Sequence, residues 1–200
     1  SFRTNKHNSV IRHSTNAFSV FALTNLDDGS EFKVGITRDN KESFTCNING
    51  EHSNKLSRLV SLLPVQLFTP QSTDLVLGSP SERRRFCDWG LFHVEHQFFS
   101  LWQSFNKILK QRNALLKQKP KNYFDEIRFW DKEFVRLSVS INNLRLSYIN
   151  RFKTRFFDKI CVDLDLVENI SLDFNPGWKS TNELTDILSE NFERDLKQGF

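Results

Sequence analysis

Glycine and proline are both absent from residues 121 to 175, and this absence constrains the fold more than any other feature of the sequence. These two residues end or kink most helices, so such a stretch allows a helix of about 30 residues or more, roughly 50 Å long. Between Ser81 and Gln118 only Gly90 interrupts a second helical composition. The two stretches predict an antiparallel helical hairpin from about Phe92 to Val162 that turns near Pro120.

Residues 17 to 50 show a different pattern, in which turn residues separate short segments with apolar residues at every second position. This alternation predicts strands at Ala17 to Leu23, Glu31 to Thr37 and Ser43 to Ile48, which form an antiparallel meander with one face toward water. Further along we expect a short helix at 55–63, strands at 65–68 and 170–174, and a last helix from a Ser180-x-x-Glu183 capping box through Leu196. The architecture predicted from the residues is mixed α/β with an inserted helical arm.

Composition excludes several classes of protein. The apolar runs are only a few residues long, whereas a membrane-spanning helix needs roughly 20. The three cysteines are never in a Cys-x-x-Cys pair, which argues against a disulfide framework or a zinc site and favours a reducing compartment such as the cytoplasm. The chain begins at Ser1 and contains no methionine, so we expect a fragment that lacks the natural start of translation.

Positive charge is concentrated in the middle of the chain. Residues 81–160 carry seventeen Lys and Arg against eight Asp and Glu, and no acid occurs between His96 and Phe124. On a helical wheel four of the five lysines of this acid-free stretch group on one face, opposite the apolar residues; they are Lys107, Lys110, Lys117 and Lys121, whereas Lys119 falls on the apolar side. Such a face suits contact with phosphates, although it could also serve only to keep a long helix soluble. Arg112 falls on the apolar side, which predicts a guanidinium bonded into the seam of the hairpin.

His93 and His96 are spaced so that two side chains on one helix could share a metal ion. The sequence lacks the His-Glu-x-x-His order, and no third ligand follows at a recognisable spacing. We therefore expect no metal here and interpret the pair as packing and capping residues at the foot of a helix.

The segment from Leu77 to Gly90 combines helix-start residues with three consecutive arginines. Ser79 and Pro80 suit the N-cap and the first helical position. The three arginines cannot all face one way, so at least one is expected to pair with Glu82 or Asp88. By composition alone the segment is a capped helix start with an ion-pair cluster, and a phosphate site is the alternative.

The same segment, together with other parts of the chain, resembles the RecF family of bacterial recombination mediators. The resemblance rests on Gly78 to His93 and Leu109 to Leu116, and on shorter matches that follow the family's order along the whole chain. These are Ser1 to Thr4, Val10 to His13, Phe68 to Pro70, Trp130 to Glu133, Gly177-Trp178 and Asn191 to Asp195.

The resemblance implies an α/β fold that is part of an ABC/SMC-type ATPase head, an antiparallel β meander with the helical hairpin inserted as lobe II. It further implies residues 1–77 as a lobe I segment, 78–168 as the arm and 169–200 as a return to the head. Family members bind ATP and Mg²⁺, dimerise when ATP is bound, and bind duplex DNA near gaps and single-strand junctions. They act with RecR and RecO to place RecA on DNA in replication-coupled repair and the SOS response.

The resemblance also implies roles for particular residues. Arg3 matches an arginine that lies close to nucleotide and DNA in related heads, and Thr69-Pro70-Gln71 match the loop that senses the γ-phosphate. Duplex DNA is expected across the base of the arm and the adjoining sheet, with the four lysines as phosphate contacts and Arg3 with Arg12 as a second patch. The residues that carry the central motif itself are Arg83, Arg84, Arg85, Asp88, Trp89 and Arg112.

The sequence departs from the family in its nucleotide motifs. It has no Gly-x-x-x-x-Gly-Lys-Ser/Thr, no second glycine-rich motif and no apolar strand ending in Asp-Asp or Asp-Glu. We expect these motifs to lie before residue 1 and after residue 200, so that this chain alone carries no catalytic residue and does not hydrolyse ATP. The alternative function is a stand-alone helical hairpin that binds a partner protein.

Overall fold

The computed structural model describes residues 7–25, 28–41, 43–53, 55–119, 123–161 and 170–200. Two compact units divide the chain, Ser1–Phe68 and Thr69–Phe200, and each is described by itself. Within the described residues no helix is both long and apolar enough to span a bilayer.

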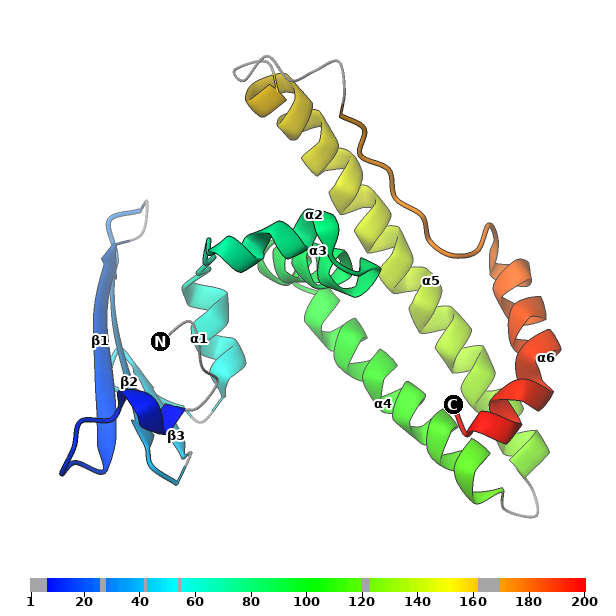
Figure 1. Cartoon of the computed structure of the whole chain (residues 1–200), viewed down its shortest axis with the longest axis horizontal. Helices are drawn as coiled ribbons and strands as arrows, with labels where there is room; N and C mark the ends of the chain where they lie inside the picture. The colour runs from blue at the N-terminus through cyan, green and yellow to red at the C-terminus, as the bar shows by residue number, and fades with distance from the viewer. Residues whose placement is uncertain (1–6, 26–27, 42, 54, 120–122, 162–169) are drawn as a thin grey trace. The chain divides into compact units, whose positions relative to one another are not determined.

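The first unit is an antiparallel meander of four strands in the order β1-β2-β3-β4, with one helix against it (Figure 1). Val34, Cys46 and Ile48 face Leu59 and form its buried core. On the opposite face the hydroxyls of Ser19 and Thr37 lie 2.8 Å apart, and Phe21 and Leu23 are 69% and 55% exposed. The elements are the 3-10 turn η1 (His7–Val10), β1 (Ala17–Asn25), β2 (Glu31–Asp39), β3 (Phe44–Ile48), β4 (Glu51–Ser53) and α1 (Leu56–Leu62).

The predicted meander is confirmed, because period-two alternation places Val34, Cys46 and Ile48 on one face. β4, a strand of three residues, was not predicted from the alternation. Asn49 and Gly50 both have positive φ, at 50° and 86°, which is the backbone of the two-residue turn that joins twisted antiparallel strands. An Asn-Gly pair is the strongest short-range hairpin signal, so this fourth strand could have been expected.

The predicted buried strand at residues 65–68 is wrong. These residues are described and form no strand, and Val65, Leu67 and Phe68 are 66%, 52% and 86% exposed. An apolar run without alternation gives no strand unless a neighbouring strand offers hydrogen bonds, and none among the described strands pairs with it.

The second unit is built on two long antiparallel helices, α4 and α5 (Figure 1). Phe105 packs on Phe134, with 5.2 Å between ring centroids, and Arg112 pairs with Asp131. The later residue of α4 thus contacts the earlier residue of α5, as an antiparallel hairpin requires. The predicted hairpin and the length of its second leg, 33 residues, are confirmed. The unit comprises η2 (Pro70–Thr73), α2 (Asp74–Leu77), α3 (Pro80–Val94), α4 (Phe98–Gln118), α5 (Tyr123–Arg155), the π-helical turn η3 (Phe156–Cys161) and α6 (Thr181–Gln198).

The first leg of the hairpin begins later than expected. The helical composition from Ser81 to Gln118 divides into α3 and α4 at Glu95 to Gln97, without a glycine or a proline. Gly90 lies inside α3 and does not interrupt it. Its function is steric, since a Cβ at this position would collide with the hydroxyl and ring of Tyr148 on α5.

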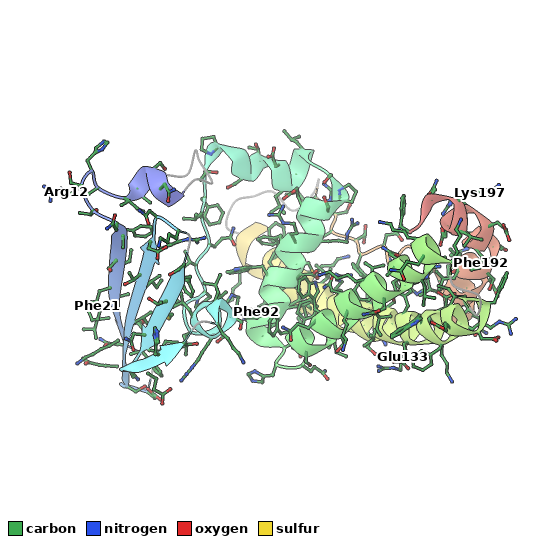
Figure 2. All side chains as sticks on the ribbon, turned by 90° about the horizontal axis from the view of Figure 1, so that it is seen from below. Arg12, Phe21, Phe92, Glu133, Phe192 and Lys197 are labelled. Carbon is green, nitrogen blue, oxygen red and sulfur yellow. The ribbon has the colours of Figure 1, made fainter. Side chains whose placement is uncertain are left out.

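Two clusters hold the helices together. The first, which we call the α3 cluster, consists of Cys87, Leu91, Phe98 and Ile141 with partly buried neighbours. The second, which we call the α6 cluster, consists of Leu115, Leu116 and Ile127, and Trp130, Phe192 and Leu196 pack against it. Phe192 is labelled on α6 in Figure 2. The hairpin therefore has separate apolar contacts with a different helix toward each end.

The last helix begins as predicted. The Glu183 N–H donates to Ser180 Oγ at 3.1 Å, and the Glu183 carboxylate accepts from the Lys179 N–H. The predicted strand at 170–174 is wrong, since these residues form extended chain without strand pairing. This segment (orange in Figure 1) has one ion pair to α5, between Lys153 Nζ and Asp173 Oδ1 at 3.5 Å.

Candidate nucleic-acid interface

Three lysines of α4 stand exposed on one helix face. Lys107, Lys110 and Lys117 are all in the exposed class, and none forms an ion pair with any residue that the structure describes. The other side of α4 is buried by Leu115 and Leu116 in the α6 cluster. Packing therefore fixes the direction of the lysine face, and no carboxylate among the described residues neutralises it.

The predicted lysine stripe can be followed only to the end of α4. α4 ends at Gln118, and Lys119 adopts the left-handed conformation with φ 47°, so a helical wheel drawn through position 121 does not apply. Lys121 itself lies outside the described residues, as does Arg3. The row that the structure supports is Lys107, Lys110 and Lys117.

Lys117 is positioned by the end of α6. Gly199 caps α6 with φ 78°, and a Cβ at Gly199 would lie 2.8 Å from Lys117 Cγ. The missing side chain leaves room for the aliphatic stem of Lys117, which can cover apolar surface while its ammonium stays in water.

Arg12 belongs to the first unit and is exposed. Its carbonyl oxygen accepts from Thr15 Oγ1 at 2.8 Å and from the Thr15 N–H at 3.1 Å, which fixes the backbone of this turn. Figure 2 shows Arg12 on the turn that precedes β1. The side chain forms no ion pair with a residue that the structure describes, so it can meet an anion at the surface of this unit.

The three consecutive arginines point to different partners. Arg83 donates to the carbonyl oxygens of Val76 and Gly78 at 3.3 and 3.0 Å, and Arg85 pairs with Glu82 at 3.0 Å. Arg84 is exposed and has no ion pair within the described part of the chain. Two of the arginines thus tie down the start of α3, and Arg84 remains as a surface cation.

Asp88 and Trp89 lie on α3 against its neighbours. Asp88 accepts two hydrogen bonds from Arg145 of α5, both at 2.7 Å, in the bidentate geometry that favours guanidinium. Trp89 packs edge-on against His93 with ring centroids 4.8 Å apart. Sequence reasoning missed Arg145, since nothing in a local pattern joins residues 57 positions apart.

The loop at Thr69 has a defined backbone. The Thr69 N–H donates to Ser72 Oγ at 2.9 Å, and the Ser72 N–H donates to the Thr69 carbonyl at 2.8 Å. Pro70 and Gln71 open η2, and the side chain of Gln71 lies outside the described residues. The role of these three residues as a nucleotide sensor stays a prediction.

The two histidines do not share a helix face. α3 ends at Val94, so His96 lies beyond it, while His93 packs between Trp89 and Phe92. Burial lowers the pKa of His93. Among the described residues no group of three His, Cys, Asp or Glu side chains could hold a metal.

At the starts of α3 and α6 one backbone N–H group is missing or already bonded. Phosphates are usually held by a glycine-rich loop that leads into a helix N-terminus. The sequence has no such loop with its lysine. Pro80 removes one N–H donor at the start of α3, and the Ser180 hydroxyl occupies the Glu183 N–H at the start of α6.

Comparison with known proteins settles the relationship that the sequence suggested. No family model matches the sequence. RecF of Pseudoalteromonas translucida (strain TAC 125), a DNA replication and repair protein, is 54% identical over 200 residues, which is 100% of this chain and 55% of that protein. The whole chain is homologous to RecF. RecF of Shewanella sediminis (strain HAW-EB3) is 37% identical over 199 residues.

RecF structures share the fold. The recombination mediator protein RecF with ATP, in the RecFOR pathway, matches with a TM-score of 0.77, 20% identity and coverage of 100% of this chain and 56% of that one. RecF with ATPrS matches with a TM-score of 0.76 at 20% identity. The predicted fold, an antiparallel β meander with a long antiparallel helical hairpin, is confirmed and is shared with these RecF structures. The chain spans about half the length of the RecF proteins that it matches.

Proposed function

We propose that this chain is the central part of a RecF-like, DNA-binding ATPase of the cytoplasm that acts in replication, recombinational repair and the SOS response. The longer protein binds duplex DNA and single-strand gaps in an ATP-dependent manner, forms a homodimer with ATP and Mg²⁺, and works with RecR and RecO to load RecA. Within it, residues 1–77 belong to lobe I, 78–168 form the arm and 169–200 return to the head. Homology to RecF over the whole chain supports this proposal.

The DNA-binding part of the proposal rests on one observation, the row of exposed lysines on α4 without a carboxylate partner among the described residues. Lys107 to Lys117 spans ten residues, or about 15 Å of helix. Along that length a DNA strand presents several phosphates, since successive phosphates on one strand are about 3.4 Å apart along the axis.

The lysines act on DNA through charge. An ammonium group that meets a phosphate releases condensed counterions, which favours binding, and it carries no information about base sequence. Neutral polar residues, Gln103, Gln111 and Gln118, accompany the lysines on this side of α4 and can donate further hydrogen bonds to the backbone. The expected role is affinity and register on duplex DNA, without sequence preference.

Binding of labelled duplexes to the 200-residue chain tests the proposal. A variant with Lys107, Lys110 and Lys117 all changed to Gln is expected to bind several unrelated duplexes more weakly by a similar factor. The slope of log affinity against log salt should fall by about 0.9 for each phosphate that a lysine no longer neutralises. A matched control changes three other exposed lysines of the same unit, Lys159, Lys179 and Lys197, to Gln. Equal effects of the two variants, or an unchanged salt slope, would exclude the α4 face and leave Arg3 and Arg12 as candidates.

A further inference from the structure

A groove of about 610 Å³ lies between α5 and α6. Its apolar lining comes from Val135 and Val139 on α5 and from Leu188 on α6. Three basic residues of α5 line it at a spacing of one helical turn, namely Arg128, Lys132 and Arg136. α6 contributes the hydroxyl side chains of Thr181, Thr185 and Ser189. The groove therefore combines an apolar lining with a cationic wall.

The charge of this wall is only partly neutralised. Asp131, which also lines the groove, bonds to the buried guanidinium of Arg112 at 2.6 Å, and Glu133 accepts from Arg136 at 3.0 and 2.9 Å. Arg128 and Lys132 are exposed and have no carboxylate partner among the described residues. Two positive charges remain available to an occupant of the groove.

Three of the four hydroxyl groups that line the groove already donate to backbone carbonyls. Thr185 Oγ1 donates to the Thr181 carbonyl at 3.2 Å, and Ser189 Oγ donates to the Thr185 carbonyl at 3.0 Å. On α5, Ser140 Oγ donates to the Arg136 carbonyl at 3.0 Å. The α6 side of the groove therefore offers hydroxyl oxygens and apolar surface, and the basic side chains of the groove all lie on α5.

This asymmetry selects one kind of occupant. The groove is lined by three apolar side chains and carries its basic side chains on α5 alone, whereas a nucleic-acid backbone has phosphates but no apolar side chains to cover Val135, Val139 and Leu188. An amphipathic protein helix can place apolar side chains on the lining and carboxylates toward α5 alone. The lining residues of α5 run from Arg128 to Ser140, about 18 Å of helix, which matches a partner helix of three to four turns.

We propose that the groove between α5 and α6 is the docking site of a protein partner that presents an acidic amphipathic helix. Its apolar face packs on Val135, Val139 and Leu188, and its Asp or Glu residues pair with Arg128 and Lys132. The charge complementarity sets orientation and specificity, and the apolar contacts supply most of the affinity. This inference uses a different face of the hairpin from the α4 lysines and does not depend on DNA binding.

A designed peptide serves as the probe. It is a labelled helix of about 14 residues with leucines on one face and glutamates along one flank, and a matched peptide has lysines in place of the glutamates. The acidic peptide should bind the 200-residue chain and shift the methyl NMR signals of Val135, Val139 and Leu188. The lysine peptide should bind at least about tenfold more weakly, equivalent to about 1.4 kcal/mol.

Charge reversal at the groove gives the decisive comparison. The double variant Arg128→Glu with Lys132→Glu should bind the acidic peptide about tenfold more weakly and should gain binding of the lysine peptide. The matched control Arg155→Glu with Lys159→Glu reverses two exposed charges of the same spacing elsewhere on the unit and should change neither peptide. Unchanged thermal unfolding verifies that each variant is folded. Failure of the acidic peptide to bind, absence of the charge exchange, or shifts of the same methyl signals by a short DNA duplex would overturn the proposal.

Discussion

Arg112 of α4 and Asp195 of α6 lie 83 positions apart in the sequence, and their side chains form an ion pair at 3.0 Å. The same guanidinium donates from Nε to Asp131 of α5 at 2.6 Å. The Arg112 side chain is only 5% exposed, so one buried cation joins three helices. This triad fixes the end of the hairpin that presents Lys117 and borders the α5–α6 groove.

Removal of Arg112 is expected to be costly. Arg112→Met leaves the carboxylates of Asp131 and Asp195 close together without their shared cation, and breaking a buried ion pair in this way lowers the free energy of unfolding by about 3 kcal/mol or more. Arg112→Lys should rescue little, because an ammonium cannot bond both carboxylates in the fork geometry of guanidinium. Urea denaturation of both variants measures the difference.

The exposed pair of Arg85 and Glu82 provides the control. It has the same kind of charges, but the Arg85 side chain is 77% exposed. Arg85→Met should therefore change the free energy of unfolding by less than about 1 kcal/mol. If Arg112→Met is no more harmful than Arg85→Met, the triad does not stabilise the junction of the three helices.

Local periodicity predicted the elements whose cause is local. Alternation at Val34 and Ile36 predicted the strands, the absence of glycine and proline predicted α5, and Ser180 with Glu183 predicted the start of α6. The helical wheel also placed Arg112 on the buried side of α4. It could not identify Asp195 as the partner of Arg112, because that contact depends on where α6 packs.

The failures have the opposite cause. The apolar run at 65–68 and the alternation at 170–174 met no neighbouring strand within the described residues, and a strand needs one. α4 ends at Gln118, so the helical wheel that grouped Lys121 with the other lysines does not extend to position 121, and helix ends are the least reliable part of any pattern. The α5–α6 groove has no local signature at all, since its two walls come from helices that only tertiary packing brings together.

A substitution at Gly90 tests the packing of α3 on α5. Gly90→Ala places a methyl group where the Tyr148 hydroxyl and ring lie, so the helices must separate or Tyr148 must move. Overpacking of this kind costs about 1 to 3 kcal/mol of unfolding free energy, even though alanine is the better helix former. Chemical denaturation should show the destabilisation.

Two further variants isolate the steric cause. Combining Gly90→Ala with Tyr148→Phe removes the colliding hydroxyl and should recover part of the stability, giving a favourable coupling in a double-mutant cycle. Gly35→Ala in β2 is the matched control, because a Cβ there meets only Asn47 Cβ at 3.9 Å. A stabilising Gly90→Ala would show that helix propensity outweighs the contact with Tyr148.

The buried Cys87 thiol is expected to lower the unfolding free energy at alkaline pH. It is 6% exposed in the α3 cluster, and burial, with a smaller contribution from the neighbouring Asp88 charge, raises the pKa of its thiol from 9.0 to about 11. Below pH 9 the thiol is protonated in the folded and unfolded states alike, so its contribution to stability is fully present. Between pH 9 and 11 the unfolded chain releases the proton while the folded chain keeps it, and unfolding becomes more favourable by up to about 1.4 kcal/mol per pH unit.

The measurement compares the pH dependence of the parent and of Cys87→Ala, since the alanine variant also loses packing and its absolute stability is not informative. Burial also raises the pKa of Tyr148 and of Cys46, so the variant keeps part of the alkaline destabilisation. From pH 9 to 11 the parent should lose about 2 to 3 kcal/mol of unfolding free energy beyond that of the variant, and the gap should stop growing above pH 11. The unfolding free energies of the two proteins could instead change in parallel over this range. The Cys87 thiol would then ionise as readily in the folded state as in the unfolded one, which would mean that the α3 cluster admits water at this position.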